Sequence, residues 1–385
     1  MDVGRMVEEA RERAGSDDLG PDSWQEPLEV LVASLTTEAD LNAMGASAMN
    51  DQIVGYLVNR LEVEQWYSKH PEIDDEEIVA PLIGLGLPRT GSTALSFLLA
   101  QDPHARSLLT WQSGEPCPPP STVEGPDPRI ERAIAAHELQ AQIAPRGQAL
   151  LPTSPTGPME CQLLMALDFR SLIFEGMAKI PAYSSWLLEC DMTPAYRYHQ
   201  RVLKLLQWRC GPTAWSLRTP AHMLSIDALD AVYPDARFVM THRDVGKVLP
   251  SVCALYDTFR SVLSDRPDPL GIGQANVATW ALALERLVAF RDAGHDDRFH
   301  DLRFDDVQRD PLGSIERLYA ALGDELTEVA RGRMQDWWTA SAAARPPAPH
   351  HAPETYGLDP IELRERFAFY HDRFDVPLTE EASDA

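Results

Sequence analysis

The sequence lacks the features that mark membrane, secreted and metal-cluster proteins. None of its 385 residues belongs to an apolar run of about 18 residues, which argues against a membrane-spanning helix. The N-terminal segment MDVGRMVEEARERAGSDD is charged and has no apolar stretch typical of a signal peptide. The five cysteines are widely spaced and form no CxxC pair, so we expect neither a disulfide framework nor a metal site. These absences favour a soluble protein of the reducing cytoplasm.

Positive charge is also scarce. Lys and Arg number 34 against 59 Asp and Glu, which gives a formal net charge of −25. So acidic a protein repels nucleic acid and anionic membranes, and neither is an expected partner. An anionic ligand can bind only where arginines and helix N-termini reverse the local potential. Motifs that could do this are therefore the main candidates for a functional site.

The hydrophobic pattern divides the chain into three expected regions. Residues 1–80 have apolar side chains at three- and four-residue spacing, which predicts a helical N-terminal cap. Residues 81–330 alternate short apolar runs with helical patterns and are the expected core. Residues 331–385 contain a proline-rich loop with His350 and His351, followed by a helical pattern near the end. We expect this last region to close over the site.

The pattern of the core predicts an α/β fold. Strand-like runs at 213–217 and 236–242 flank the helical segment SIDALDAVYP, and short links join the three. Such a unit implies a parallel sheet flanked by helices, here of the P-loop type. Further strands are expected at 82–87 and 300–307, and further helices at 91–101, 129–144, 159–178, 194–209 and 360–373.

The first motif is LIGLGLPRTGSTAL at 82–95. A strand that breaks into a helix here would turn free N–H groups and the positive end of the helix dipole toward an anion. Gly91 allows close backbone approach, and Arg89 offers a bidentate fork. Ser92 and Thr93 add hydroxyl donors, although an ordinary turn with Ser92 as N-cap is the alternative. Ser92 also occupies the place of the lysine in nucleoside-triphosphate loops, which disfavours hydrolysis of ATP or GTP.

The second motif is ARFVMTHRDVGKVLPSVCALY at 236–256. The strand stops at Thr-His-Arg-Asp, so Arg243 lies at the carboxyl end of a parallel strand, where open α/β sheets bind ligands. Ser251, eight residues later, is expected to turn toward the same space from the following helix. His242 is expected to shape this site. The alternative is a surface pair between Arg243 and Asp244.

Together the two motifs carry a resemblance. PRTGST followed by a distant strand ending in HRD, with serine eight residues after the arginine, resembles sulfotransferases that use 3′-phosphoadenosine 5′-phosphosulfate (PAPS). The bacterial branch that also includes the tyrosylprotein enzymes is the most similar. The resemblance covers residues 82–375, including SLRTPAHMLSIDALDAVYPDARFVMTHRD and FDDVQRDPLGSIERLYAALG. It implies PAPS as cosubstrate and a hydroxyl as sulfuryl acceptor, with no metal.

The resemblance also implies a role for each motif residue. The 5′-phosphosulfate would be held by Arg89, Thr90, Gly91, Ser92 and Thr93. The 3′-phosphate would be held by Arg243 and Ser251. The missing lysine is then accounted for, because PAPS has no γ-phosphate and needs no Mg²⁺.

Sulfuryl transfer needs cations for the charge that grows on oxygen and a base for the acceptor hydroxyl. Arg89 is the expected cation at the leaving oxygen, with Arg218, at its own strand end, as a second. Candidate bases, in order, are His222 beyond that strand, Glu160 at a helix start and Glu115 in a proline-rich loop. Their structural alternatives are orientation of the next helix for His222, a helix-dipole partner for Glu160 and a solvated surface carboxylate for Glu115.

The chain departs from the family pattern at three positions. Arg218 stands where lysine is frequent, Val245 where proline often follows HRD, and Gln112 where a glutamate often stands; Gln112 cannot act as a base. The acceptor pocket is expected from the aromatic-rich segment 159–208, unless those side chains form core. An apolar alcohol such as a lipid, steroid or polyketide-like molecule would suit such a pocket. An atypical small-molecule kinase and a non-catalytic adenosine-bisphosphate-binding protein are the rival functions, and the pattern sets no oligomeric state.

Overall fold

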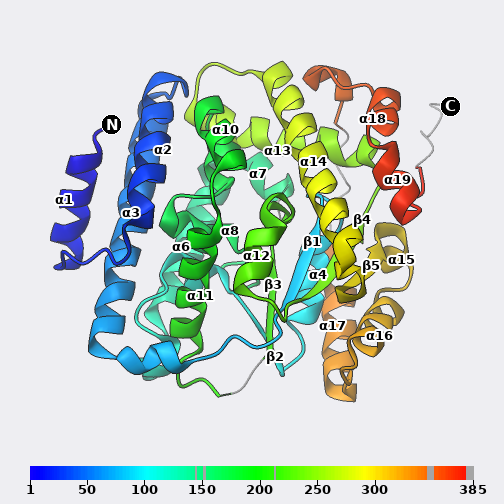
Figure 1. Cartoon of the computed structure of the whole chain (residues 1–385), viewed down its shortest axis with the longest axis horizontal. Helices are drawn as coiled ribbons and strands as arrows, with labels where there is room; N and C mark the ends of the chain where they lie inside the picture. The colour runs from blue at the N-terminus through cyan, green and yellow to red at the C-terminus, as the bar shows by residue number, and fades with distance from the viewer. Residues whose placement is uncertain (144, 151–152, 212–213, 345–350, 379–385) are drawn as a thin grey trace.

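A parallel β-sheet covered by helices forms the centre of the protein in a computed structural model, which describes residues 1–143, 145–150, 153–211, 214–344 and 351–378 (Figure 1). Within these ranges five strands lie in the order β2-β3-β1-β4-β5, and every neighbouring pair is parallel. Their bounds are β1 Leu82–Gly86, β2 Ala105–Ser107, β3 Ala214–Arg218, β4 Arg237–His242 and β5 Phe299–Arg303. The predicted α/β fold is confirmed.

The central strands β1 and β4 are short apolar runs because helices cover both faces of the sheet. Gly86 ends β1 with a φ of 116°. A Cβ at this position would lie 2.4 Å from the carbonyl oxygen of Thr241 on β4. Glycine alone satisfies both the left-handed backbone and the close approach. The chain can therefore leave the sheet abruptly and enter the loop of the first motif.

The N-terminal region is helical, as predicted, with α1 Val3–Ala14, α2 Gln25–Thr37 and α3 Ala43–Lys69. Figure 1 shows these helices (blue) at one end of the molecule. Their apolar faces join the same hydrophobic cluster that contains Ile83 of β1 and Phe238 of β4. The boundary at residue 80 remains a prediction, because the apolar core continues across it.

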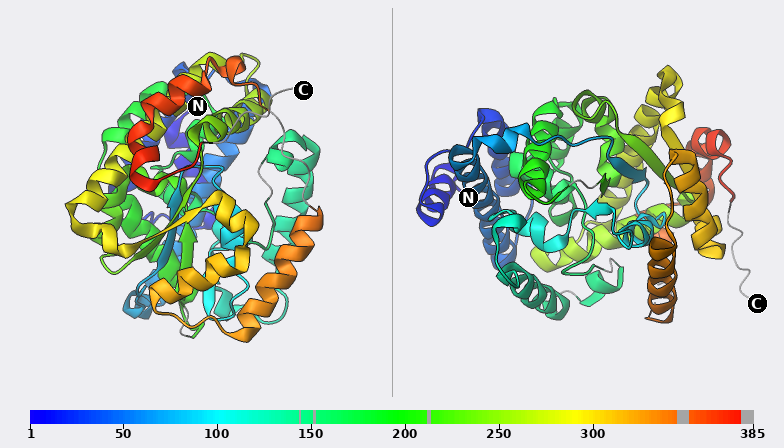
Figure 2. Two further views of the ribbon diagram at one scale, coloured as in Figure 1. Left: turned by 90° about the vertical axis from the view of Figure 1, so that its right-hand side faces the viewer. Right: turned by 90° about the horizontal axis from the view of Figure 1, so that it is seen from below.

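The remaining helices cover the sheet, and Figure 2 shows the C-terminal ones (orange and red) at the end away from α1–α3. Their bounds are α4 Ser92–Leu99, α5 Thr110–Gly114, α6 Pro128–Ile143, α7 Pro145–Leu150, α8 Gln162–Met165, α9 Ile173–Met177, α10 Pro181–Glu189, α11 Thr193–Gln207, α12 Ile226–Val232, α13 Val245–Leu263, α14 Pro269–Phe290, α15 Phe304–Arg309, α16 Pro311–Leu322, α17 Glu328–Ala344, α18 Pro360–Arg366 and α19 Ala368–Phe374. No helix in the described ranges has the length and apolar character needed to cross a membrane.

Several expected elements differ in the structure. The segment predicted as one helix at 159–178 is broken into α8 and α9, because buried Phe169 adopts a left-handed backbone with φ of 57°. The strand predicted at 300–307 ends at Arg303, and the next residues form α15. Strand β2 and helix α17 were not predicted from the pattern. His350 lies outside the described residues.

Candidate functional site

The loop between β1 and α4 is anchored by a buried threonine. Thr90 is 1% exposed, and its hydroxyl donates to the carbonyl oxygen of Leu87 at 2.6 Å. The same hydroxyl lies 2.6 Å from the hydroxyl of Thr241 on β4. The side chain of Thr90 therefore stabilises the loop, and only its backbone is left for the ligand role that the resemblance implies.

Helix α4 begins directly at this loop without a side-chain cap. Gly91 is the N-cap, with φ of 90°, so the alternative of a Ser92 N-cap is wrong. The first turn has no acidic residue to offset the helix dipole. Ser92 and Thr93 are partly exposed, which makes their hydroxyls and the free N–H groups of the first turn available to an anion.

The two motifs meet at one edge of the sheet. The register pairs Gly86 of β1 with Thr241 of β4, so both strands end side by side. Nη1 of Arg243 donates to the carbonyl oxygen of Arg89 at 2.9 Å. Nε of Arg89 donates to the hydroxyl of Ser251 on α13 at 3.0 Å, and its Nη1 donates to a carbonyl of α7. A single ligand could therefore contact both motifs.

The electrostatics of this edge favour an anion. Among the described residues, neither Arg89 nor Arg243 forms an ion pair with a carboxylate, although the protein is strongly acidic. Burial, and secondly the positive charge of Arg243, lower the pKa of Arg89. Burial also lowers the pKa of Arg243, against the opposing effect of Asp305 and Asp244. Guanidinium groups remain charged despite such shifts, so two like charges repel each other here until an anion neutralises them.

Three contacts that the sequence did not indicate hold the second motif. The guanidinium of Arg243 stacks on the ring of Phe304, 4.0 Å from its centroid. Asp244 accepts from the backbone N–H of Gly246 and so caps α13. Its other oxygen accepts from Arg364 of α18 at 2.7 Å. Asp244 therefore pairs with Arg364, and not with Arg243 as the alternative interpretation held. Helix α18 thus fixes the start of α13.

A second charged group lies at the end of the adjacent strand β3. Arg218 is 6% exposed and its Nη1 donates to Glu160 at 3.0 Å. Glu160 also accepts from the hydroxyl of Thr219 at 3.1 Å and from the amide of Gln162 at 2.8 Å. Register with β1 pairs Arg218 with Gly84, two residues before the end of that strand at Gly86. Glu160 therefore lies near the same edge of the sheet, held by three donors.

Helix α13, which carries Ser251, also carries a tyrosine whose pKa responds to the charge of Glu160. Tyr256 follows Ser251 by five residues on this helix. Burial first, and then the negative charges of Glu175 and Glu160 among others, raise the pKa of Tyr256. Its hydroxyl therefore stays protonated and remains a donor. Tyr256 is the last residue of the second motif, but the sequence alone indicated no role for it.

His222, the first candidate base, does not face a crevice. Its side chain is fully buried, and Nδ1 lies 2.9 Å from the hydroxyl of Tyr196 on α11. Burial, and then the neighbouring His199, lower the pKa of His222 well below its ordinary value. The expectation that His222 faces a crevice is wrong, because the turn after β3 directs its ring into the helical layer, toward Tyr196.

Glu115 takes the structural role that was its alternative. The carboxylate, whose side chain is 43% exposed, pairs with Arg132 of α6 at 2.5 Å. The backbone carbonyl of Glu115 accepts from Arg129 of the same helix. Glu115 thus joins the proline-rich loop to α6 at the surface. Gln112 is buried and its side chain accepts from the N–H of Leu109.

Most aromatic residues of 159–208 are core. The fully or nearly buried ones are Phe169, Phe174, Tyr183, Tyr196, Tyr198 and Trp208. Met159 and Leu163, on either side of Glu160, are partly exposed. The apolar surface that could meet an acceptor is therefore smaller than the sequence suggested and lies beside Glu160.

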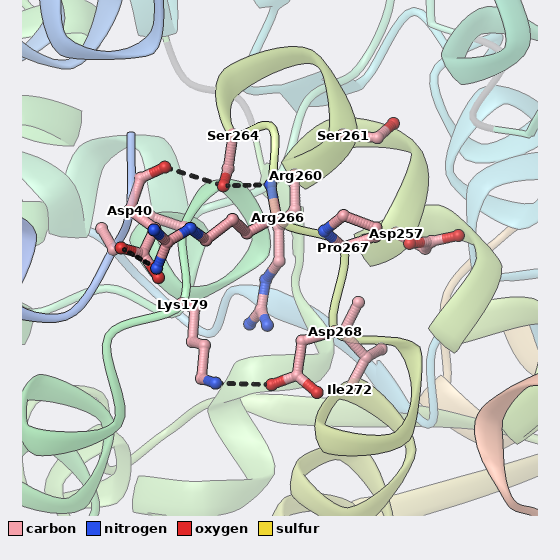
Figure 3. Close-up of a pocket in the computed structure, with 12 residues that line it drawn as sticks. Asp40, Lys179, Asp257, Arg260, Ser261, Ser264, Arg266, Pro267, Asp268 and Ile272 are labelled. Carbon is pink, nitrogen blue, oxygen red and sulfur yellow. Dashed lines mark hydrogen bonds and ion pairs between the residues drawn. The ribbon is translucent and has the colours of Figure 1, made fainter. Parts of the chain in front are cut away.

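A cavity of about 240 Å³ lies elsewhere, at the C-terminal end of α13 (Figure 3). None of the predicted site residues lines it. Lys179 pairs with Asp268 at 2.7 Å and Arg266 with Asp40 at 3.3 Å across this space. Arg260, which also lines the cavity, donates to the backbone carbonyl of Glu175, so most of the positive charge here already has a partner within the protein.

A parallel sheet with a glycine-containing loop at a helix N-terminus and two arginines at the same edge defines a protein of the anion-binding α/β class. The chain belongs to the Sulfotransferase family, whose sequence model matches residues 81–328. Two curated relatives, the omega-hydroxy-beta-dihydromenaquinone-9 sulfotransferases Stf3 of Mycobacterium bovis and Mycobacterium tuberculosis, are each 26% identical over 268 residues. Each match covers 64% of this chain and 64% of the relative, which is less than two thirds of the relative's length.

Two solved structures are similar over nearly the whole chain. Sulfotransferase STF9 from Mycobacterium avium is 32% identical, with a TM-score of 0.91 and 98% of both chains covered. Sulfotransferase STF1 from Mycobacterium tuberculosis is 31% identical, with a TM-score of 0.82, covering 96% of this chain and 99% of that one. The similarity includes the helical N-terminal region, which lies outside the family match.

Proposed function

We propose that this protein transfers the sulfuryl group of PAPS to a hydroxyl of a small, mainly apolar acceptor. One observation carries the proposal: Arg89 and Arg243 lie close enough to repel each other, without a carboxylate partner among the described residues. They lie at the edge where the uncapped α4 begins. A nucleotide phosphorylated at its 5′ and 3′ positions would neutralise both guanidinium groups.

The contacts suggest how such a donor would bind. The first turn of α4, with Gly91, Ser92 and Thr93, offers N–H and hydroxyl donors to the 5′-phosphosulfate. Arg243 and Ser251 would hold the 3′-phosphate. Ser251 already accepts from Arg89 at 3.0 Å, so the two ends of the ligand would be held by adjoining groups.

The proposed reaction is an in-line displacement at sulfur. The acceptor oxygen forms a bond to sulfur while the bond from sulfur to the bridging oxygen of the 5′-phosphate breaks, releasing adenosine 3′,5′-bisphosphate. Arg89 stabilises the charge that grows on the bridging oxygen. Glu160 takes the proton of the acceptor hydroxyl. A carboxylate has about four lone-pair positions, and three donors already orient this one, so one position is left for the acceptor.

An apolar alcohol is the acceptor class that we propose. Met159 and Leu163 place partly exposed apolar surface on both sides of Glu160. The two curated relatives are named for a hydroxylated menaquinone derivative, a lipid-like acceptor. The strongly acidic chain also disfavours acceptors that carry many negative charges.

Two measurements test the proposal. In a thermal-shift titration, adenosine 3′,5′-bisphosphate should stabilise the protein and ATP with Mg²⁺ should not; at 100 times Kd the expected gain is about 2.7 kcal/mol. Arg243→Ala should remove this preference for the bisphosphate. Transfer of radiolabelled sulfuryl from PAPS to a panel of apolar alcohols then tests turnover. Binding without transfer to any alcohol would indicate a non-catalytic binder, and a preference for ATP with Mg²⁺ would indicate a kinase.

A further inference from the structure

A chain of hydrogen bonds ties the C-terminal helix α19 to the end of strand β4. Tyr370 of α19 is completely buried, and its hydroxyl lies 3.2 Å from Nδ1 of His242. The backbone N–H of Arg243 donates to the same hydroxyl at 3.3 Å. On the other side of the ring, Nε2 of His242 lies 2.8 Å from a carboxylate oxygen of Asp301 on β5. These residues are far apart in sequence and belong to three different elements.

The charges fix the direction of each hydrogen bond. Arg291 donates to both oxygens of Asp301 at 2.8 Å. Burial opposes ionisation of Asp301, but the hydrogen bonds from Arg291 and His242 outweigh it and hold its pKa below the ordinary value. Burial lowers the pKa of His242, which is therefore neutral and donates to Asp301 through Nε2–H. Nδ1 then has a lone pair and accepts from the hydroxyl of Tyr370, which in turn accepts from Arg243 N–H.

We propose that Tyr370 is a positioning residue that aims Arg243 at the 3′-phosphate of the nucleotide, an inference that rests on the proposed function. A long arginine side chain is directed by its backbone, and this backbone lies where regular pairing of β4 ends. The hydroxyl of Tyr370 accepts from the N–H of Arg243 there, and the ring of Phe304 packs against the guanidinium. Helix α19 therefore forms part of the nucleotide site without touching the ligand.

The test measures discrimination between two nucleotides that differ only at the 3′ position. Calorimetry gives the affinity for adenosine 3′,5′-bisphosphate and for adenosine 5′-monophosphate in the wild type and in Tyr370→Phe. We expect the ratio of the two affinities to fall about five- to tenfold, the scale of one hydrogen bond. The affinity for the monophosphate should change less than about twofold, because that ligand does not use Arg243.

Tyr233→Phe is the matched control. The hydroxyl of Tyr233 lies 2.7 Å from Nδ1 of His199, so this variant also breaks a buried tyrosine–histidine pair. Tyr233 precedes the start of β4, at the end of that strand away from Arg243. Tyr233→Phe should lower the melting temperature about as much as Tyr370→Phe does, but it should leave the ratio of the two nucleotide affinities unchanged. Equal changes of the ratio in both variants would mean general loosening and would overturn the positioning role.

Two further variants separate this inference from the proposed function. If Arg243→Ala removes the preference for the bisphosphate while Tyr370→Phe leaves it intact, the positioning role is wrong and the function stands. If Arg243→Ala also leaves the preference intact, both fail. His242→Gln serves if Tyr370→Phe does not fold: it keeps a donor toward Asp301 but loses the acceptor at Nδ1. It should lower the ratio in the same direction, and an unchanged ratio would again overturn the inference.

Discussion

Replacing Glu160 by glutamine tests the proposed base directly. The amide has the shape of the carboxylate, and its oxygen can still accept from Arg218 or Thr219. It cannot take a proton from the acceptor hydroxyl. A general base contributes about 10²- to 10⁴-fold to a rate, which corresponds to about 2.7–5.4 kcal/mol of the barrier at 1.36 kcal/mol per decade. We therefore expect kcat for sulfuryl transfer to fall by at least about a hundredfold.

The same substitution should also affect stability, and the two effects have to be separated. Arg218 is nearly buried and loses its only carboxylate partner in the described chain, so unfolding should become easier by about 1–3 kcal/mol. The assay is steady-state transfer of radiolabelled sulfuryl well below the melting temperature of the variant. The fraction of folded protein is measured separately, by calorimetric titration with adenosine 3′,5′-bisphosphate. This ligand does not contact Glu160 in the proposed complex, so its stoichiometry counts the folded sites.

The other two candidate bases provide the controls. Glu115→Gln removes a surface pair worth about 0–1 kcal/mol and should leave kcat unchanged. His222→Asn should destabilise the protein, because it disturbs a buried contact with Tyr196, while the remaining folded molecules keep their kcat. The reasoning is refuted if Glu160→Gln retains kcat within about twofold of the wild type, or if Glu115→Gln lowers it a hundredfold.

Three further outcomes are expected. Arg89→Ala should raise the barrier of transfer by about 2.7–4 kcal/mol, measured as kcat/KM, and near-wild-type transfer would remove Arg89 from the reaction. Gly86→Ala should lower the free energy of unfolding, measured by urea titration, by about 1–3 kcal/mol because its Cβ meets a carbonyl oxygen at 2.4 Å. Gly125→Ala, where φ is 79° but no atom lies within 4 Å of the added Cβ, should lower it less. Burial lowers the pKa of His199 from 6.5 to about 3, so between these values only the unfolded chain takes up the proton. His199 should therefore lower the free energy of unfolding by up to about 1.4 kcal/mol per pH unit as pH drops through this window. His199→Gln should remove this part of the slope in urea titrations and leave the part that the lowered pKa of His222 contributes.

The parts of the site that are local in sequence were predictable. Gly86 and Gly91 mark where the backbone must turn sharply, and the uncapped start of α4 follows within a few residues. The apolar runs of β1 and β4 identify central strands, because strands covered on both faces have few polar residues. Parallel strands end at one edge of a sheet, which is why Arg89 and Arg243 could be expected together before any coordinates were known.

The tertiary structure alone decided which of several similar side chains meet. Glu160 and Arg218 are 58 residues apart and Arg243 and Tyr370 are 127 apart, so no local pattern encodes these contacts. In the sequence, His222 follows the end of a strand, as a base at the sheet edge would, but the turn after β3 buries its side chain. Hydrophobic periodicity reports which face of an element is covered, not which distant residue covers it. The chemistry of the anion-binding loop therefore follows from adjacent residues, whereas the partners of each charge depend on how helices from both ends of the chain pack against the sheet.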